Sequence, residues 1–291
     1  MRDARSFSVV GAGRLGTTLA AALVRRGWKA ELIVDEDARA ARESRRVVGR
    51  GRAAAALRAG ARPGGVVFVA VPDDAVGRVA AGLARSGVPW SGRAVFHLSG
   101  LLPARVLAPL ARRGAVTASL HPVQAFPRKD SPASIFKGVT WGVEGDPAGV
   151  EAASEVVRAL GGAILLLAET DKPLYHAACV MASNTLVALE RTAVGLLGAI
   201  GIGSGEAAGM LLPLAQRTLQ NVKDLGLEKA LTGPVLRGDA ATVRKHLEAL
   251  RADPAARQVY LALSRQALEI AVERGLGADR VRPMKRLLRG G

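Results

Sequence analysis

The feature that most constrains the fold is a glycine-rich segment, Gly11–Gly16, with the sequence GAGRLG. It follows an apolar run at residues 7–10, typical of a strand, and leads into apolar residues at helical spacing. The first glycine permits a tight turn, the second lets the backbone approach a pyrophosphate, and the third allows close helix packing. The helix N-terminus then attracts phosphates. The sequence predicts that a dinucleotide, NAD or NADP, binds at Gly11, Ala12, Gly13, Arg14, Leu15 and Gly16.

A second apolar run, residues 30–34, ends in Asp35, nineteen positions after Gly16. A carboxylate at about this distance accepts hydrogen bonds from a ribose 2′-hydroxyl and repels a 2′-phosphate. Asp35 therefore favours NAD. The arginines of the helix expected over residues 37–48 favour NADP instead, so both cofactors stay open. A polar residue that merely ends the strand is the alternative interpretation of Asp35.

Apolar runs of strand length recur at residues 66–71, 94–97, 115–120, 139–143 and 163–167, with helical patterns between most of them. This alternation predicts an α/β fold, a doubly wound and mostly parallel sheet with helices on both faces. Such sheets bind ligands outside the carboxyl ends of their strands. The candidates for cofactor or substrate contacts at those ends are Asp35, Val71, Pro72, Asp73, Ser99 and His121.

The alternation stops near Glu169, and the rest of the chain has helical patterns only. Helices are expected over residues 174–200, 206–225, 240–251 and 254–275. The first of these is apolar on nearly all sides, which is typical of a buried central helix. We therefore predict a dinucleotide-binding domain over residues 1–168 and an all-helical domain over residues 169–291. The basic tail from Asp279 shows no obvious core partner and is expected to fray.

The chain carries 41 Lys and Arg against 25 Asp and Glu, a formal net charge of +16. These cations are scattered without interleaved aromatic residues that stack bases, so we expect no nucleic-acid partner. The positive field still attracts anionic cofactors and substrates. No apolar stretch approaches the roughly 20 residues that span a bilayer, and no signal peptide is recognisable. We expect a cytoplasmic protein without membrane contact, and the spacing of the residues predicts no metal site.

Hydride transfer to a carbonyl or imine needs a proton donor near the developing charge. His121 follows a strand directly, and Pro122 stiffens its loop. His176 lies early in the apolar helix, where an unpaired imidazole is costly. At roughly 100° per residue, Ser183 falls about 20° and Asn184 about 80° around a continuous helix from His176. We predict catalytic or substrate-binding roles for His176, Asn184 and His121. A satisfied polar cluster in the core is the alternative.

Two further side chains are candidates for substrate binding. Ser99 could hydrogen-bond the nicotinamide or a substrate carboxylate, although a simple turn explains Ser99–Gly100 nearly as well. Arg237, beside a glycine, could present its planar fork to a carboxylate. A solvated arginine is an equally good interpretation. Asp239 is expected to cap the helix that begins at residue 240.

Taken together, several of these segments resemble one bacterial family of oxidoreductases. They are the glycine-rich segment, Val71–Asp73, His97–Gly100, His121–Gln124, Tyr175–Ala178 with Asn184, and Leu231–Pro234 with Arg237–Asp239. In that family a Rossmann-like domain precedes a helical domain of unknown function. The resemblance covers nearly the whole chain except the basic tail. The wider relatives that the chain resembles are the pyrroline-carboxylate reductases, the ketopantoate reductases, the prephenate dehydrogenases and the hydroxyacid dehydrogenases. The resemblance implies a C-terminal domain like that of 6-phosphogluconate dehydrogenase.

The resemblance implies an NAD(P)-dependent oxidoreductase that acts on a small anionic keto or imino acid, ketopantoate being one plausible type. It also implies a homodimer formed through the helical domain. Thr232 corresponds in placement to a threonine-rich substrate loop, and His121 to a histidine-proline loop of prephenate dehydrogenases. One position departs from the hydroxyacid dehydrogenases, because Val180 stands where their catalytic lysine would be. Either His176 is the acid, or the chain is a dinucleotide-binding sensor or scaffold without turnover.

Overall fold

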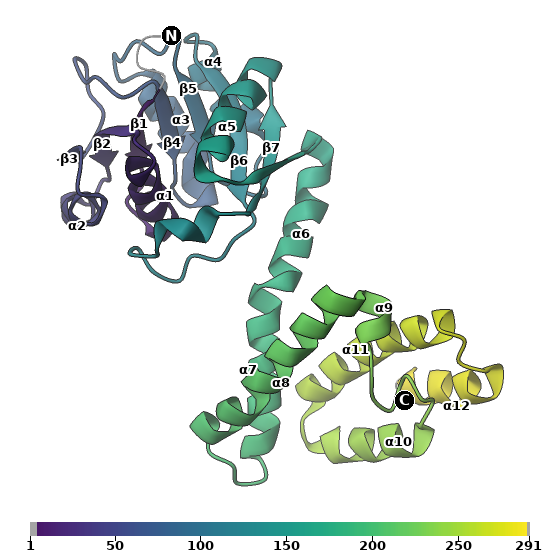
Figure 1. Cartoon of the computed structure of the whole chain (residues 1–291). Helices are drawn as coiled ribbons and strands as arrows, with labels where there is room; N and C mark the ends of the chain where they lie inside the picture. Colours follow the sequence, from purple (N-terminus) through teal and green to yellow (C-terminus); the bar gives the residue numbers. More distant parts are fainter. Residues whose placement is uncertain (1–4, 290–291) are drawn as a thin grey trace. The chain divides into compact units, whose positions relative to one another are not determined.

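The computed structural model describes residues 5–289 of the 291-residue chain. The chain forms two compact units, Met1–Ala182 and Ser183–Gly291 (Figure 1). The first unit contains one eight-stranded sheet, and helices make up the second. This architecture confirms the predicted α/β fold class with a separate helical region.

The strands of the first unit are β1 (Ser6–Val10), β2 (Lys29–Val34), β3 (Arg52–Ala54), β4 (Val66–Val69), β5 (Ala94–His97), β6 (Val116–Pro122), β7 (Thr140–Gly145) and β8 (Ala163–Leu166). Their order across the sheet is β3-β2-β1-β4-β5-β6-β7-β8. All neighbours run parallel except β6 and β7. The first six strands thus have the doubly wound order, with its reversal between β1 and β4, where such sheets bind nucleotides.

The apolar strands form because both faces of the sheet are covered. The helical elements of this unit before the last strand are α1 (Arg14–Arg25), α2 (Ala38–Val48), α3 (Asp73–Ala84), the 3-10 turn η1 (Ala104–Leu107), α4 (Ala108–Ala111), the 3-10 turn η2 (Ala133–Phe136) and α5 (Pro147–Leu160). Along β4, Val66 and Phe68 pack with residues of α1 and α5, whereas Val67 and Val69 pack with residues of α3. Alternate side chains of one strand therefore enter two cores, which explains the continuous apolar run.

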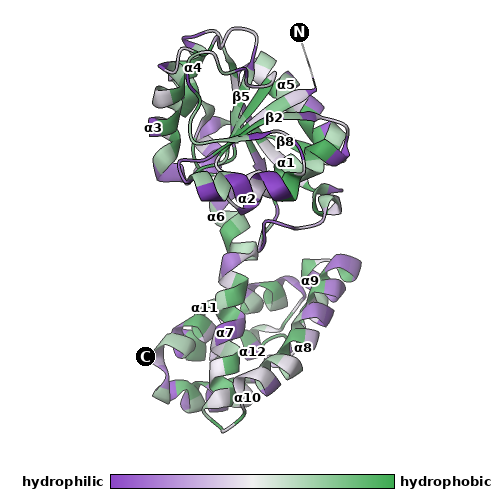
Figure 2. Ribbon diagram, turned by 90° about the vertical axis from the view of Figure 1, so that its left-hand side faces the viewer, coloured by the Kyte–Doolittle hydropathy of each residue, from purple (hydrophilic) through white to green (hydrophobic). Residues whose placement is uncertain are grey.

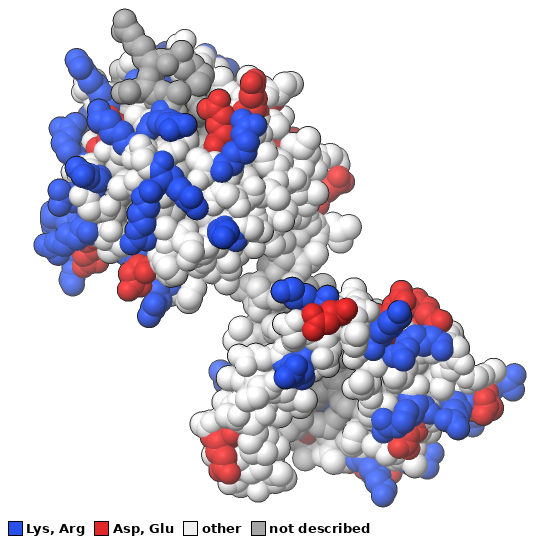
Figure 3. Space-filling model, viewed as in Figure 1, with Lys and Arg blue, Asp and Glu red and all other residues white. Residues whose placement is uncertain are grey.

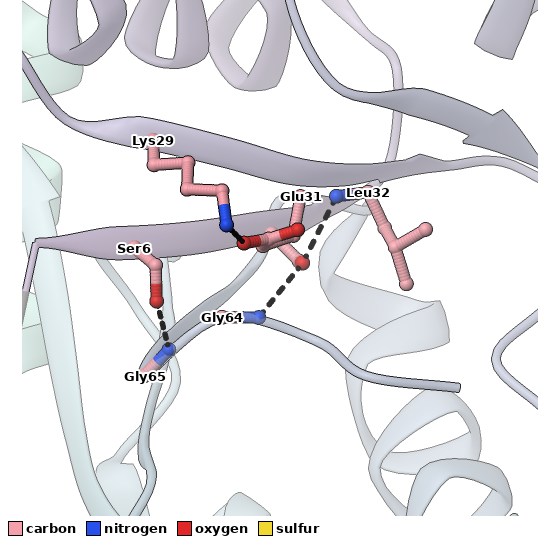
Figure 4. Close-up of polar contacts among 7 residues, drawn as sticks. Ser6, Lys29, Glu31, Leu32, Gly64 and Gly65 are labelled. Carbon is pink, nitrogen blue, oxygen red and sulfur yellow. Dashed lines mark hydrogen bonds and ion pairs between the residues drawn. The ribbon is translucent and has the colours of Figure 1, made fainter. Parts of the chain in front are cut away.

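Serine side chains fix the segment that leads into β4 against β1 (Figure 4). The Ser8 hydroxyl accepts hydrogen bonds from Gly64 N and Leu32 N, both at 3.2 Å, and Ser6 accepts one from Gly65 N at 2.9 Å. A Cβ at Gly64 would collide with the backbone of Phe7, so only glycine fits this close approach. These contacts set the register that brings the end of β4 beside the glycine-rich turn.

The helix predicted over residues 174–200 is two helices, α6 (Lys172–Ala182) and α7 (Asn184–Gly198), separated at Ser183. A 3-10 turn, η3 (Glu169–Asp171), precedes α6, which belongs to the first unit. The expectation that this segment is buried is wrong for the single chain, because Leu174 is 79% exposed and Val187 is 71% exposed. Its apolar character therefore does not come from a core within one unit.

The second unit contains α7, α8 (Ser204–Leu225), α9 (Leu227–Ala230), α10 (Ala240–Ala249), the 3-10 turn η4 (Leu250–Ala252), α11 (Pro254–Glu273) and α12 (Ala278–Leu288). The expectation that the basic tail frays is wrong up to residue 289. Met284 and Leu288, one helical turn apart, are buried in the core that α10 and α11 share. Arg265 Nε also donates to Leu288 O at 2.7 Å. No helix among residues 5–289 is long and apolar enough to cross a membrane.

Candidate active site

The glycine-rich turn between β1 and α1 has the steric features that a dinucleotide requires. Gly11 has φ +107°, and a Cβ there would collide with the carbonyl of Ala70 at the end of β4. A Cβ at Gly16 would collide with the carbonyl of Gly11, so this residue must be glycine for α1 to approach the turn. Both positions therefore require glycine, because a side chain would collide with the neighbouring backbone.

Gly13 differs from its two neighbours because a Cβ there would meet no atom within 4 Å. It is exposed and forms the N-cap of α1, which has no side-chain cap and no acidic residue in its first turn. The space beside Gly13 is therefore open, and no side chain caps the N–H groups of the first helical turn, which suits the phosphates of a dinucleotide. The residues present fit this group.

Asp35 braces the glycine turn. Its Oδ2 accepts a hydrogen bond from Ala12 N at 2.7 Å, and its Oδ1 accepts one from Asp37 N at 2.9 Å. Each carboxylate oxygen can accept a further bond, so the ribose role remains compatible with this bracing. Asp35 also lines a cleft of about 520 Å³ together with Gly11, Gly13, Val71, Pro72 and Arg78. Sequence reasoning missed Arg78, which is one of many arginines at helical positions.

The hydroxyl group of Ser99 has no hydrogen-bonding position left for a ligand. Its Oγ donates to Asp73 Oδ2 at 2.7 Å and accepts from Leu101 N at 3.1 Å and Leu102 N at 2.9 Å. A hydroxyl has one donor and two acceptor sites, and all three are in use. Ser99 therefore ties the loop after β5 to the start of α3, and Asp73 serves the same link.

His97, at the end of β5, is fully buried and holds the same loop. Its Nε2 lies 3.1 Å from Pro103 O, and since a carbonyl only accepts, Nε2 carries the proton. Its Nδ1 then accepts from Ser99 N at 3.3 Å. Burial, helped by the positive charge of Lys172, lowers the pKa of His97 to about 4. The imidazole is therefore neutral at neutral pH.

Lys172, the first residue of α6, is a fully buried lysine that sequence reasoning missed. Its Nζ lies 2.6 Å from Ser119 Oγ on β6. Burial lowers the pKa of Lys172, while the carboxylates of Glu144 and Asp73 oppose that shift. One signal was available in the sequence, because a cation in the first turn of a helix opposes the helix dipole and needs another reason to be there.

His121, Tyr175 and His176 form a cluster beside the loop after β5. His121 Nδ1 lies 2.8 Å from the Tyr175 hydroxyl. The His121 and His176 rings are nearly perpendicular, with centroids 5.7 Å apart. A Cβ at Gly100 would lie 2.5 Å from His176 Nδ1, and one at Gly142 would lie 2.5 Å from the Tyr175 hydroxyl. The two glycines therefore leave the room that the three rings occupy.

The electrostatics of this cluster keep the His121–Tyr175 pair uncharged. Burial, with the nearby His176 and Lys172, lowers the pKa of His121 to about 4. Burial also raises the pKa of the Tyr175 hydroxyl, which lies beside the Cys179 thiol. His176 Nδ1 is buried and has no hydrogen-bond partner within the described part of the chain. A buried imidazole nitrogen without a hydrogen-bond partner is costly, which makes this atom a candidate for contact with a ligand.

The structure brings together only some of the predicted site residues. His121 and His176 are in contact in the first unit, whereas Asn184, Thr232 and Arg237 belong to the second unit. Asn184 accepts a hydrogen bond from Ser183 Oγ at 2.9 Å, and the break at Ser183 ends the continuous polar stripe expected from His176 to Asn184. Thr232 and Arg237 are exposed. Across residues 5–289, no group of three or more His, Cys, Asp or Glu side chains could hold a metal ion.

Comparisons with known proteins identify both parts of the chain. The family model of a Rossmann-like domain matches residues 1–122, and that of a domain of unknown function (DUF2520) matches residues 139–267. A search of curated protein sequences found no match.

Solved structures share the fold over almost the whole chain. Protein TM1727 from Thermotoga maritima is 25% identical, with a TM-score of 0.71 over 92% of this chain and 99% of that one. A proposed NADP oxidoreductase of Bacteroides fragilis, BF3122, is 24% identical, with a TM-score of 0.75 over 91% and 98%. A reductive aminase of Aspergillus terreus in complex with NADPH and ethyl levulinate is 21% identical, with a TM-score of 0.62 over 97% and 99%.

Imine reductases and prephenate dehydrogenases are among the further structures that share the fold. The two family models together account for most of the chain, in the order that the sequence resemblance implied. The chain therefore combines a region that matches the Rossmann-like domain model with a following region that matches the DUF2520 model.

Proposed function

We propose that this protein is an NAD(P)-dependent oxidoreductase that transfers a hydride between nicotinamide and a small anionic keto or imino acid. One observation carries the proposal. The first unit has an open helix N-terminus at Gly13 and, near the carboxyl end of β6, a cluster of His121 with Tyr175 and His176 of α6. The fold shared with a reductive aminase supports a carbonyl or imine as the reacting group.

The glycine-rich turn would hold the pyrophosphate, and Asp35 would accept hydrogen bonds from the adenosine ribose. The bound cofactor supplies or accepts the hydride. Because Asp35 repels a 2′-phosphate, we expect NAD to bind more tightly than NADP. Val71 and Pro72 line the same cleft and would contact the dinucleotide beyond the turn.

The cluster would supply the proton that the substrate needs during reduction. Hydride addition to a carbonyl or imine leaves an electron pair on the heteroatom, which must be protonated. His121 is neutral, and in the tautomer whose Nδ1 accepts from the Tyr175 hydroxyl, the His121 proton lies on Nε2 and can hydrogen-bond the heteroatom. We assign proton donation to His176, whose Nδ1 lacks a partner in the described part of the chain. The loop locked by Ser99 and His97 holds Gly100 between the two imidazoles.

Fluorescence titration with NADH and NADPH tests the cofactor assignment. All three tryptophans, Trp28, Trp90 and Trp141, lie in the first unit, so energy transfer to the reduced nicotinamide reports binding there. Turnover is then measured with a panel of 2-keto acids, each with and without ammonia or a primary amine. If neither reduced nucleotide binds at millimolar concentration, the proposal is wrong.

His176→Ala tests the proton donor, with His246→Ala as the control, because His246 is an exposed histidine of the second unit bonded to Tyr260. We expect the His176 variant to lose about 100-fold in kcat with an unchanged dissociation constant for the cofactor. Binding of the nucleotide without turnover on any substrate would favour a dinucleotide sensor or scaffold instead.

A further inference from the structure

We propose that Lys172 is a positioning residue, whose buried side chain ties the start of α6 to β6 and thereby sets Tyr175 and His176 against His121 and Gly100. The inference deepens the proposed function and depends on it for the catalytic consequence. Its structural consequence can be measured without turnover.

The tether is a short chain of hydrogen bonds. Lys172 Nζ lies 2.6 Å from Ser119 Oγ, and Ser119 Oγ donates to Ser99 O at 3.2 Å. Tyr175 and His176 come three and four residues after Lys172 in α6, so all three lie on one face of the helix. Fixing Lys172 on β6 therefore fixes the rotation of the face that presents the two rings.

The direction of these bonds excludes a proton relay through Lys172. The Ser119 hydroxyl has a single hydrogen, which it gives to the carbonyl of Ser99, because a carbonyl only accepts. The bond between Lys172 and Ser119 must then be donated by the ammonium or amine group. The chain ends at a backbone carbonyl, which passes no proton onward. Lys172 thus acts through the groups that it holds.

Polar groups of four neighbouring elements surround the Lys172 side chain. In the sheet register, His97 on β5, Ser119 on β6 and Glu144 on β7 are direct neighbours. Glu144 accepts from Ala104 N at 2.7 Å at the start of η1. Asp73 at the start of α3 and His121 on β6 also interact electrostatically with Lys172. The lysine therefore lies among polar groups of β5, β6, β7 and the start of α3.

Two substitutions separate the tether from the charge. Lys172→Met keeps the length and removes the charge and the donor, whereas Ser119→Ala removes the tether and keeps the charge. Lys137→Met, at an exposed lysine of the same unit, is the control. We expect Lys172→Met and Ser119→Ala to lower kcat by about 10- to 100-fold, since small misplacements have effects of this size. The dissociation constant for NADH should stay within about twofold in all variants, because the glycine turn is elsewhere in the unit.

Histidine titration by NMR supplies the readout that does not need turnover. Removing a nearby positive charge favours protonation, so the pKa of His121 should rise from about 4 in Lys172→Met. Ser119→Ala keeps the charge, so a change in the His121 titration of that variant reports that the Tyr175 and His176 rings have moved. Wild-type kcat in both variants, or an unchanged His121 titration in Lys172→Met, overturns the inference. If Lys172→Met does not fold, Lys172→Gln, which also removes the charge, with the same NMR readout and the kcat of Ser119→Ala decide. If the wild-type protein turns over no substrate, the proposed function is wrong, but the structural role of Lys172 is still tested by the NMR titration.

Discussion

At the scale of single residues, Gly13 separates cofactor binding from folding. We predict that Gly13→Asp weakens NADH binding at least tenfold while the free energy of unfolding changes by less than about 1 kcal/mol. A side chain has room there, and aspartate is a good N-cap, but its charge would occupy the phosphate position. Isothermal titration calorimetry and urea unfolding measure the two effects. Gly13→Ser, a neutral cap, should lose less affinity. Wild-type affinity in the aspartate variant would contradict the cradle.

A variant of Asp35 tests a different property, the proposed choice between NAD and NADP. We predict that Asp35→Ser shifts the ratio of dissociation constants for NADPH and NADH by about tenfold toward NADPH, because the repulsion of the 2′-phosphate is lost. The variant should also lose about 1 kcal/mol of unfolding free energy, since the bond to Ala12 N is weakened. Asp35→Asn, which removes the charge and keeps an acceptor, is the matched control. An unchanged ratio in fluorescence titrations refutes the assignment.

The lowered pKa of His97 predicts how the stability of the first unit depends on pH. Its pKa is about 4 in the folded state against 6.5 for an ordinary histidine, so the unfolded chain binds more protons between these values. Stability is therefore fully present above pH 6.5 and falls as the pH drops toward 4, by about 3 kcal/mol from this residue. Urea unfolding followed by tryptophan fluorescence measures it, because all tryptophans lie in this unit. The free energy of unfolding of His97→Gln should fall less steeply as the pH drops. A slope identical to that of the wild type would contradict the prediction.

Residue roles differ in how far the sequence could reveal them. His121 was selected because the sequence placed it directly after a strand, at the edge where doubly wound sheets bind ligands, and it lies one residue before the end of β6. The lock formed by Ser99 with Asp73, residues 26 positions apart, depends on a long-range contact that no local pattern encodes. Lys172 has one local signal, its position in the first turn of a helix, but its partner Ser119 is 53 positions away and no local pattern points to it. A local pattern shows where a strand ends, but it does not show which hydroxyl groups are already in use.

At the scale of elements, α12 is a helix rich in cations whose Met284 side chain is nevertheless fully buried. We predict that Met284→Ala lowers the unfolding free energy of the second unit by 2 to about 4 kcal/mol, because the fully buried side chain leaves a cavity. Far-UV circular dichroism during urea unfolding measures it, while tryptophan fluorescence, which reports the first unit, should not change. Arg286→Ala, an exposed position of the same helix, should cost less than about 0.5 kcal/mol. Equal effects of the two variants would contradict the packing of the tail.

The ends of the expected strands and helices agree with the structure to within two residues, apart from the break at Ser183. Runs such as residues 66–69 are apolar throughout because both faces are covered, and few other structures produce that pattern. The basic tail was misjudged because only Met284 and Leu288 reach the core among many cations. The break at Ser183 left no sequence signal, since serine is compatible with a helix interior. The antiparallel pairing of β6 with β7 likewise depends on partners distant in sequence.

At the scale of the whole molecule, the unexplained feature is an apolar surface on the second unit. No residue of α7 is buried, and α8 buries only Ala207. Exposed side chains on or near these helices include Val187, Ile200, Met210 and Leu214. The helices carry many hydrophobic residues (Figure 2), and their surface is mostly uncharged in the view of Figure 3. Soluble monomers rarely expose apolar patches larger than a few hundred Å².

We propose that a second copy of the chain covers this surface, which makes the protein a homodimer through its helical unit. Light scattering after size exclusion should give twice the 30.1 kDa mass of one chain. Val187→Glu combined with Leu214→Glu should yield the single-chain mass, because burying two carboxylates opposite apolar side chains costs several kcal/mol. Lys245→Glu, at an exposed position of α10, should remain dimeric. A wild-type protein of single-chain mass at 50 µM, or a double variant that remains dimeric, would exclude this interface. Far-UV circular dichroism of the double variant must match the wild type, so that a lower mass reports dissociation and not unfolding.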